Sequence, residues 1–453
     1  MNTSPGVKLL LGEPKKAILE ISKIAIIAMF ISSLYSVVDL IWASGISETA
    51  LTSIGFVNPI YLGVIAIANG FSYGASTIIS KYIGLKDKNN VNNSSIHILI
   101  IIIILSIFLT VFLNYFLKDL ILITGGESVL ESSLSYGNIL FSGTILIVFV
   151  NTTLGIFRGE ANSKKAIIGL AIGLILNIIL DPLFIYIFNL GINGSAIATL
   201  ISLIFVSVYY IYLLLKNSYI DFNLRYFKLK KDILNDILKI SLPTSLENLF
   251  IPILYGFLNY ILILIMSQDG VAIFNVGWQI LAFIMSPIFA IGMSMVSLIA
   301  VNYSKRNFKN ILLVKNYVLK ISIIIAIALS ILIFILSPYI GDLFVYSSQA
   351  AQISDDISYF LKVTCIYYVF LPFGISASYT LKGLGHGFSS LIVSFFNTVV
   401  CQGLAILILV FLFNFDEKGI WYGIIIGNSI GSIISFTLSN YYINKLYLKK
   451  EKK

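Results

Sequence analysis

Long apolar stretches recur along the whole chain, each near or above the roughly 20 residues that a helix needs to cross a bilayer. They show no strand-length alternation of apolar and polar residues, which excludes the strands of a membrane barrel. Only 11% of the 453 residues are charged, against roughly 25% in a soluble domain. Because backbone groups in a bilayer must be hydrogen-bonded within the protein, the sequence predicts an all-α polytopic membrane protein.

Twelve transmembrane helices are predicted. They cover residues 20–44, 50–82, 94–117, 132–156, 164–189, 194–216, 237–266, 271–302, 315–338, 355–382, 387–413 and 419–445. The basic segment before the first span lacks the short apolar region and cleavage site of a signal peptide, so we expect this helix to be retained.

Basic residues gather in the tails and in every second connection between spans, for example at Lys86 and Lys305. The opposite connections carry only Lys118, Lys362 and Lys418. This positive-inside bias predicts a multi-pass protein of the cell membrane with both termini in the cytoplasm. Its basic residues are spread over many loops instead of one face, so we expect the lipid bilayer and no nucleic acid as a partner.

The chain divides into two similar sets of six spans, separated by its longest polar stretch, residues 216–239. A shift of 220 residues lays IGLKDKNN on YSKRNFKN, and a shift of 224 lays FRGEANSKKA on LKGLGHGFSS. Such a parallel repeat is typical of transporters. We therefore predict an N-lobe (1–216), a basic cytoplasmic linker (217–236) and a C-lobe with a basic tail (237–453), with the lobes related by pseudo-two-fold symmetry.

Two aspartates interrupt apolar spans, Asp39 in FISSLYSVVDLIWASG and Asp181 in GLAIGLILNIILDPLFIYIF. An acid at the bilayer centre costs about 2.5 to 3.5 kcal/mol on insertion scales, which a bound cation or proton would offset. In the repeat, Asp39 aligns with Asn259, and Asp181 with Ala405. The acids thus belong to the first half alone, and we predict that cation handling is located there.

Asn177 lies four residues before Asp181, which puts both side chains on one helical face. Pro182 has no amide hydrogen, so the carbonyl of Ile178 loses its usual partner. The face therefore offers a carboxylate, an amide oxygen and a spare backbone carbonyl, which are the oxygen ligands that hard cations favour. The alternatives are that Asp181 ends a helix in water and that Asp39 is bonded to Tyr35.

The stretches LNIILDPLFIYIFNLGINGSAIAT, FRGEANSKKA and LYSVVDLIW resemble the multidrug and toxic compound extrusion (MATE) family, over the whole chain. The resemblance implies an antiporter that expels organic, mostly cationic compounds in exchange for protons or sodium ions. It implies a cation site, for sodium if sodium is the coupling ion, of Asp39, Asn177, Asp181 and Thr199, with Tyr35 in the supporting network. We expect a monomer without a cofactor.

The chain departs from the family in its first helix, where Ile24 stands at the position of a proline that kinks many members. This puts proton-driven bending of that helix in doubt, but not ion coordination. Pro243 keeps a proline in the seventh span.

Three further polar residues are candidates for contact with the substrate or the cavity: Glu247, Asn151 and Asn259. Glu247, in LPTSLENLF, resembles a glutamate of one MATE branch, but its partners there are missing. It could instead bond Ser245 or Asn248, or face the cavity. Arg158 and Lys382 occupy equivalent places in the two halves, and we expect both to anchor loops.

Two other functions are less compatible with the residues. A flippase for lipid-linked oligosaccharides or polysaccharides would hold phosphate with arginine and lysine, and the spans contain almost no central cations. An intramembrane enzyme would need a catalytic set such as Ser with His or two close aspartates. The two histidines, His97 and His386, lie far from the acids, so we expect a transporter and not an enzyme.

Overall fold

The structure is a computed structural model that describes residues 4–123, 126–216, 218–223, 227–342 and 348–451. The side chains that it describes exclude those of residues 35–41, 43, 44, 48, 51, 267–269, 272, 341, 342, 348–353 and 446–451. Below, residues 4–216 are called the first half and residues 231–451 the second half.

Helices form nearly all of the described chain. In order they are α1 (Pro5–Leu11), α2 (Pro14–Ser44), α3 (Glu48–Gly84), α4 (Lys88–Ile123), η1 (Glu127–Val129), α5 (Leu130–Ser142), α6 (Thr144–Gly159), α7 (Ser163–Pro182), η2 (Leu183–Ile187), α8 (Ile192–Lys216), α9 (Lys231–Ser304), α10 (Phe308–Asp342), α11 (Ser348–Gly383), α12 (Gly387–Phe395), η4 (Phe396–Cys401), α13 (Gln402–Leu407), η5 (Ile408–Leu412) and α14 (Asp416–Glu451).

The prediction of twelve spans is confirmed in the described residues. Eleven helical segments are long and apolar enough to cross a membrane, and α5 with α6, bent by 51° at Gly143, supplies a twelfth. The long helix α9 contributes two spans, Lys231–Met266 and Ile273–Ser304. These pack side by side, because the Tyr255 ring lies 5.7 Å from the Phe274 ring and 5.1 Å from the Trp278 ring, centroid to centroid.

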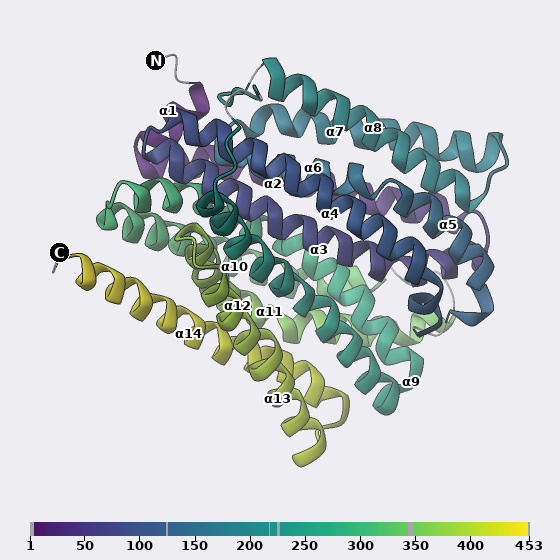
Figure 1. The fold of residues 1–453 in the computed structure, drawn as a ribbon. Coiled ribbons are helices and arrows are strands. Elements are labelled where there is room, and N and C mark those ends of the chain that lie inside the picture. The colour runs from purple at the N-terminus through teal and green to yellow at the C-terminus, as the bar shows by residue number, and fades with distance from the viewer. Residues whose placement is uncertain (1–3, 124–125, 217, 224–226, 343–347, 452–453) are drawn as a thin grey trace.

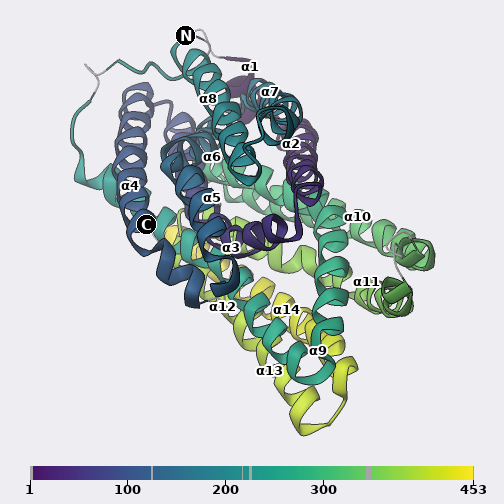
Figure 2. The same cartoon turned by 90° about the vertical axis from the view of Figure 1, so that its right-hand side faces the viewer.

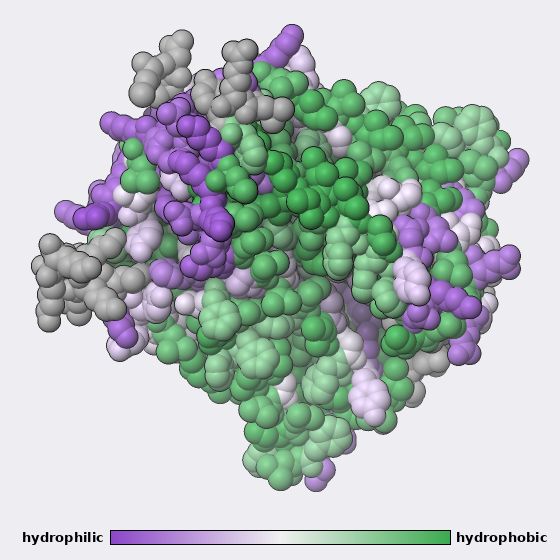
Figure 3. All heavy atoms as spheres, in the orientation of Figure 1, coloured by the Kyte–Doolittle hydropathy of each residue, from purple (hydrophilic) through white to green (hydrophobic). Residues whose placement is uncertain are grey.

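Both termini lie at one end of the helical bundle, at the left of Figure 1. We call this end the terminal side and the other the far side. The two halves lie close together near the terminal side and diverge toward the far side (Figures 1 and 2). Figure 3 shows apolar side chains over the middle of one face and hydrophilic side chains near both ends, as expected for a bilayer-spanning surface.

The backbone repeats between the halves even where the side chains differ. Left-handed residues recur at connections in matching places, with shifts of 220, 224 and 225. The pairs are Lys86 (φ 57°) with Arg306 (φ 58°), Ala161 (φ 52°) with Gly385 (φ 81°), and Asn189 (φ 55°) with Asn414 (φ 55°). The π-helical turns η2 and η5 precede the last pair. The two pairs of matched sequence stretches, IGLKDKNN with YSKRNFKN and FRGEANSKKA with LKGLGHGFSS, therefore fall on equivalent turns.

The buried apolar residues form two large clusters, one built mainly from each half. Each cluster also includes a few residues from the other half of the chain or from its first turns. Leu10, Ile18 and Tyr73 belong to the cluster of the second half, whereas Ile233 and Ile237, in the first turns of α9, belong to that of the first half. Apart from Tyr73, these residues lie near the terminal side, so the halves share a core there.

Close approach of α3 to α9 makes this shared core possible. A Cβ added at Gly70 would overlap the hydroxyl and the backbone nitrogen of Ser245, and one added at Gly74 would overlap the hydroxyl of Ser241. The two glycines are four residues apart, as are the two serines, so small residues face each other over one turn. Small residues of this kind allow helices in membranes to approach closely.

The connection between the halves is fixed by Glu160, which follows α6. Its fully buried carboxylate accepts hydrogen bonds from the hydroxyl of Ser218 (2.9 Å) and the backbone N–H of Tyr219 (2.7 Å). Burial raises the pKa of Glu160 to about 7, although these bonds, Asn162 and the charge of Lys88 act in the opposite direction. The connection is shorter than the linker predicted over 217–236, because α9 begins at Lys231.

We expect Gly70→Ala to destabilise the protein by about 1 to 3 kcal/mol, the usual range for overpacking. Thermal unfolding of the purified protein in detergent measures this effect. Gly63→Ala in the same helix is the control, because no atom lies within 4 Å of its added Cβ. Equal melting temperatures for the two variants would contradict the close crossing.

We expect the stability of the wild type to fall between about pH 4.5 and pH 7, relative to Glu160→Gln. The unfolded carboxyl loses its proton near its ordinary pKa of 4.5, whereas the folded one keeps it until about 7. The unfolded state therefore binds fewer protons in this window, and folding weakens as the pH rises. Melting curves across this range check the difference, and parallel pH profiles would contradict it.

Candidate functional site

Asn177 and Asp181 lie together on the buried face of α7. Both side chains are fully buried. The Asn177 Nδ2 donates a hydrogen bond of 3.2 Å to the Asp181 Oδ1, as expected for residues four apart in a helix. The Asn177 Oδ1 then has no hydrogen-bond partner among the described residues. An acceptor oxygen thus stays available beside the carboxylate.

The backbone becomes irregular directly after Asp181. Helix α7 ends at Pro182, and the π-helical turn η2 follows, in which the N–H of Phe188 donates to the carbonyl of Leu183 at 2.9 Å. The Tyr186 hydroxyl of this turn donates to the carbonyl of Trp42 at 2.8 Å. The part of α2 that follows Asp39 is therefore tied to the turn that follows Asp181.

The remaining members of the expected cation site lie on two other helices. Thr199 is buried on α8, which packs along α7. Asp39 and Tyr35 lie in α2, which also packs against α7, but their side chains are outside the described residues. The structure thus joins Asn177 to Asp181 directly and places Thr199 on a neighbouring helix. Carboxylate, carboxamide and hydroxyl oxygens are ligands suited to sodium.

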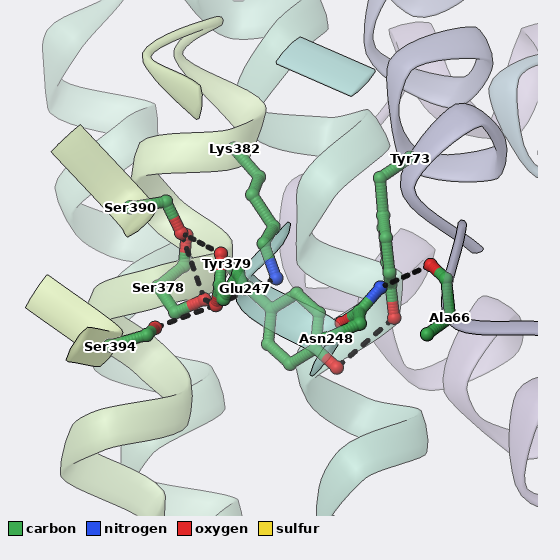
Figure 4. A network of polar contacts seen from close by, with 9 residues as sticks. All are labelled: Ala66, Tyr73, Glu247, Asn248, Ser378, Tyr379, Lys382, Ser390 and Ser394. Carbon is green, nitrogen blue, oxygen red and sulfur yellow. Dashed lines mark hydrogen bonds and ion pairs between the residues drawn. The ribbon is translucent and has the colours of Figure 1, made fainter. Parts of the chain in front are cut away.

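Glu247 lies in a separate polar cluster in the second half (Figure 4). The alternative of a local hydrogen bond with Ser245 or Asn248 is wrong. The Ser245 hydroxyl donates to the carbonyls of Ile67 and Ser241, and the Asn248 amide donates to the carbonyl of Ala66. The side chains of Ser245 and Asn248 thus form hydrogen bonds with α3 or with the preceding turn of α9, and not with Glu247.

The carboxylate of Glu247 accepts hydrogen bonds from three serines on two other helices. Ser378 of α11 and Ser394 of α12 donate to its Oε1 at 2.7 and 2.6 Å, and Ser390 of α12 donates to its Oε2 at 2.8 Å. The Nζ of Lys382 lies 3.1 Å from the Oε1. Glu247 is therefore a buried, fully bonded carboxylate with its own counter-charge.

Lys382 does not anchor a loop as we expected. It is only 3% exposed, and besides Glu247 its ammonium lies 4.8 Å from the ring centroid of Tyr73 and 4.7 Å from that of Tyr379. Arg158 also turns inward: it donates to the Ser72 hydroxyl at 2.6 Å, and its Cζ lies 5.0 Å from the Tyr73 ring centroid. Both cations border the interface between the halves.

The two asparagines proposed for the cavity differ in their surroundings. The Asn151 amide donates to the carbonyl of Ile147, one turn earlier in its own helix. Asn259 on α9 is half-buried, and its Oδ1 has no hydrogen-bond partner among the described residues. Asn259 therefore keeps a side-chain oxygen available.

Sequence reasoning missed three buried charged groups. Glu160 and Lys382 were hidden by their positions near span ends. Lys315 on α10 is fully buried, where it donates to Ser439 at 3.2 Å and to Asn440, with its ammonium over the Phe436 ring. Lys382 lies in the last turn of α11 and Lys315 in the first turns of α10, so neither lysine is central in its span. The ammonium of Lys382 is neutralised by Glu247, and that of Lys315 is held by polar side chains.

Known proteins resemble the chain over nearly its whole length. Multidrug export protein MepA of Staphylococcus aureus (strain NCTC 8325 / PS 47) is 24% identical over 435 residues, and the match covers 93% of each chain. The MepA protein of Staphylococcus saprophyticus is 25% identical, again over 93% of each.

Solved structures match both sequence and fold. A MOP superfamily transporter from Pyrococcus furiosus Vc1, described as having a binding pocket of reverse polarity, is 34% identical with a TM-score of 0.96. An outward-facing multidrug resistance MATE family transporter is also 34% identical, with a TM-score of 0.95. Each match covers 99% of this chain and 100% of the other. The MatE family model matches residues 25–183 and 243–407, and the chain therefore belongs to the MatE family of transporters.

Proposed function

We propose that this protein is a multidrug antiporter that exports amphipathic organic cations in exchange for sodium ions or protons. The main support for ion coupling is the fully buried Asn177–Asp181 pair inside a membrane helix. A charged carboxylate in such a place needs compensation. In a member of a transporter family, a coupling ion is the natural source of that compensation.

The pair can respond to either ion. When Asp181 is ionised, the Asn177 amide must donate to it, so the Asn177 oxygen is left to accept or to coordinate. A sodium ion would meet both oxygens, and the Thr199 hydroxyl and the Asp39 carboxylate would complete its shell. When Asp181 carries a proton, its O–H becomes a donor, and the amide can turn to accept from it.

The transport cycle would open the space between the two halves to one side of the membrane and then to the other. We assign the terminal side to the cytoplasm because basic residues gather in its connections. The closed terminal side then corresponds to an outward-facing state, and export as a monomer needs no further chain. Ion and drug exchange if each stabilises a different state or if both compete for the same acids.

A flippase for lipid-linked sugars is not favoured. The relatives named for multidrug export support drug transport, and Lys382 has Glu247 as its counter-charge instead of a free cavity in which to hold phosphate.

We expect Asp39→Asn and Asp181→Asn each to abolish coupled efflux, because the neutral amide cannot exchange a proton or compensate a sodium ion. The assay follows a fluorescent cation leaving proteoliposomes under a sodium gradient or a proton gradient, each imposed alone. Asp119→Asn, at an exposed position of α4, is the control and should transport like the wild type. Wild-type rates in the Asp181 variant would refute the site.

We also expect Asn177→Ala and Thr199→Ala to weaken ion binding more than drug binding. Losing one neutral ligand should reduce ion affinity by about 5- to 150-fold if each contact is worth about 1 to 3 kcal/mol. Calorimetry of sodium and of a drug, each against the purified protein, separates the two effects. Asn114→Ala, on an exposed face of α4, is the control. Equal losses of ion and drug affinity would argue against a ligand role.

A further inference from the structure

Lys382 connects the acid of one half to an aromatic ring of the other. Its Nζ lies 3.1 Å from the Glu247 Oε1, within the second half, and 4.8 Å from the ring centroid of Tyr73, on α3 of the first half. Figure 4 shows the lysine between these two groups. A cation over an aromatic face is attracted to it, and the attraction grows when water is excluded.

Further bonds surround this contact and also join the halves. The hydroxyls of Tyr73 and Tyr379 are 3.1 Å apart, and the Thr77 hydroxyl donates to the backbone carbonyl of Lys382 at 3.2 Å. One turn along α3, Ser76 pairs with Ser297 of α9 at 3.0 Å. We call this set of contacts between the halves the seam. Lys382 lies at its centre, and the seam closes the terminal side.

Glu247, by contrast, has its bonds among the described residues inside the second half alone. Its partners Ser378, Ser390 and Ser394 lie on α11 and α12, and the ion pair with Lys382 is also local to this half. Separation of the halves breaks none of these contacts. What it breaks is the contact of Lys382 with Tyr73 and the bonds beside it.

We propose that Glu247 and Lys382 form a latch, in which Glu247 positions the Lys382 ammonium against Tyr73 and so keeps the terminal side closed. Without the carboxylate, a long flexible lysine can reach toward water. Lys382 is thus a positioning residue for the transport cycle, and Glu247 acts through it. The latch rests on the proposed function in one respect, that the terminal side opens during transport.

A simpler account is that the pair only neutralises two buried charges. Buried ion pairs often add little to stability compared with apolar residues of the same size. That account predicts an effect on folding but none on the balance between closed and open states. An independent ion site at Glu247 makes a third prediction, that removal of the acid has its effect with or without Lys382.

Distances between spin labels on the terminal side distinguish these accounts. Labels at Asn89→Cys and Lys309→Cys are exposed in equivalent first turns of α4 and α10, in a background with Cys365 and Cys401 replaced by alanine. The protein in lipid nanodiscs gives a short and a long distance for the closed and open states. Their ratio is the readout, and it requires no transport.

We expect the open-to-closed ratio to rise roughly 2- to 30-fold in Lys382→Met and in Glu247→Gln, the range implied by a cation–π contact. The double variant should equal the single ones, and it also folds without an unpaired buried charge. Lys382→Arg should restore closure. Tyr73→Phe, which keeps the ring, should stay more closed than Tyr73→Leu.

The control is Lys315→Met, which removes a buried ammonium whose partners in the described part of the chain lie in the second half. It should leave the ratio at the wild-type value. An unchanged ratio in Lys382→Met, an equal rise in Lys315→Met, or additive effects in the double variant would overturn the latch. Coupled efflux retained in Asp181→Asn would instead overturn the proposed ion coupling, while these ratios stand.

Discussion

The close crossing of α3 over α9 is the contact on which the rest of the interface depends. Glycines on one helix and serines on the other bring the backbones together, and every polar contact between the halves near the seam becomes possible only at that distance. The adjoining turns of α3 carry Tyr73, Ser76 and Thr77, which form hydrogen bonds with residues of α9 and α11. In hydrocarbon, where apolar side chains gain little by leaving lipid, such packing and bonding are the main forces that hold helices together.

The proposed ion site and the proposed latch lie at different levels of the molecule. Asp181 stands at the end of α7 toward the far side, next to the π-helical turn, whereas Glu247 and Lys382 lie toward the terminal side. The first acid has an asparagine beside it, and the second has a lysine and three serines. Two carboxylates in similar apolar surroundings are thus suited to different tasks by their neighbours, one to exchange an ion and the other to hold a fixed charge.

Local patterns in the sequence predicted much of the architecture. Apolar length predicted the spans, and helical spacing predicted the contact of Asn177 with Asp181, because both depend on residues close in sequence. Glu247 and Lys382 are 135 positions apart, and neither residue type nor spacing indicates that they meet. Glu160 was missed for a similar reason, since its burial comes from Ser218 and Tyr219 in the connection between the halves. The π-helical turns and the left-handed residues at connections also depend on packing that no short pattern encodes.

The ring of Tyr73 has a further consequence, because Arg158 of the first half approaches it as well as Lys382. With Glu247 ionised, the second half presents a neutral pair to a positively charged neighbour across the seam. If the carboxylate were neutral, two positive charges would face one another around a single ring in a medium of low dielectric constant. The net charge that the second half presents to Arg158 therefore depends on one carboxylate, whereas the Tyr73 ring attracts a cation from each half in either case.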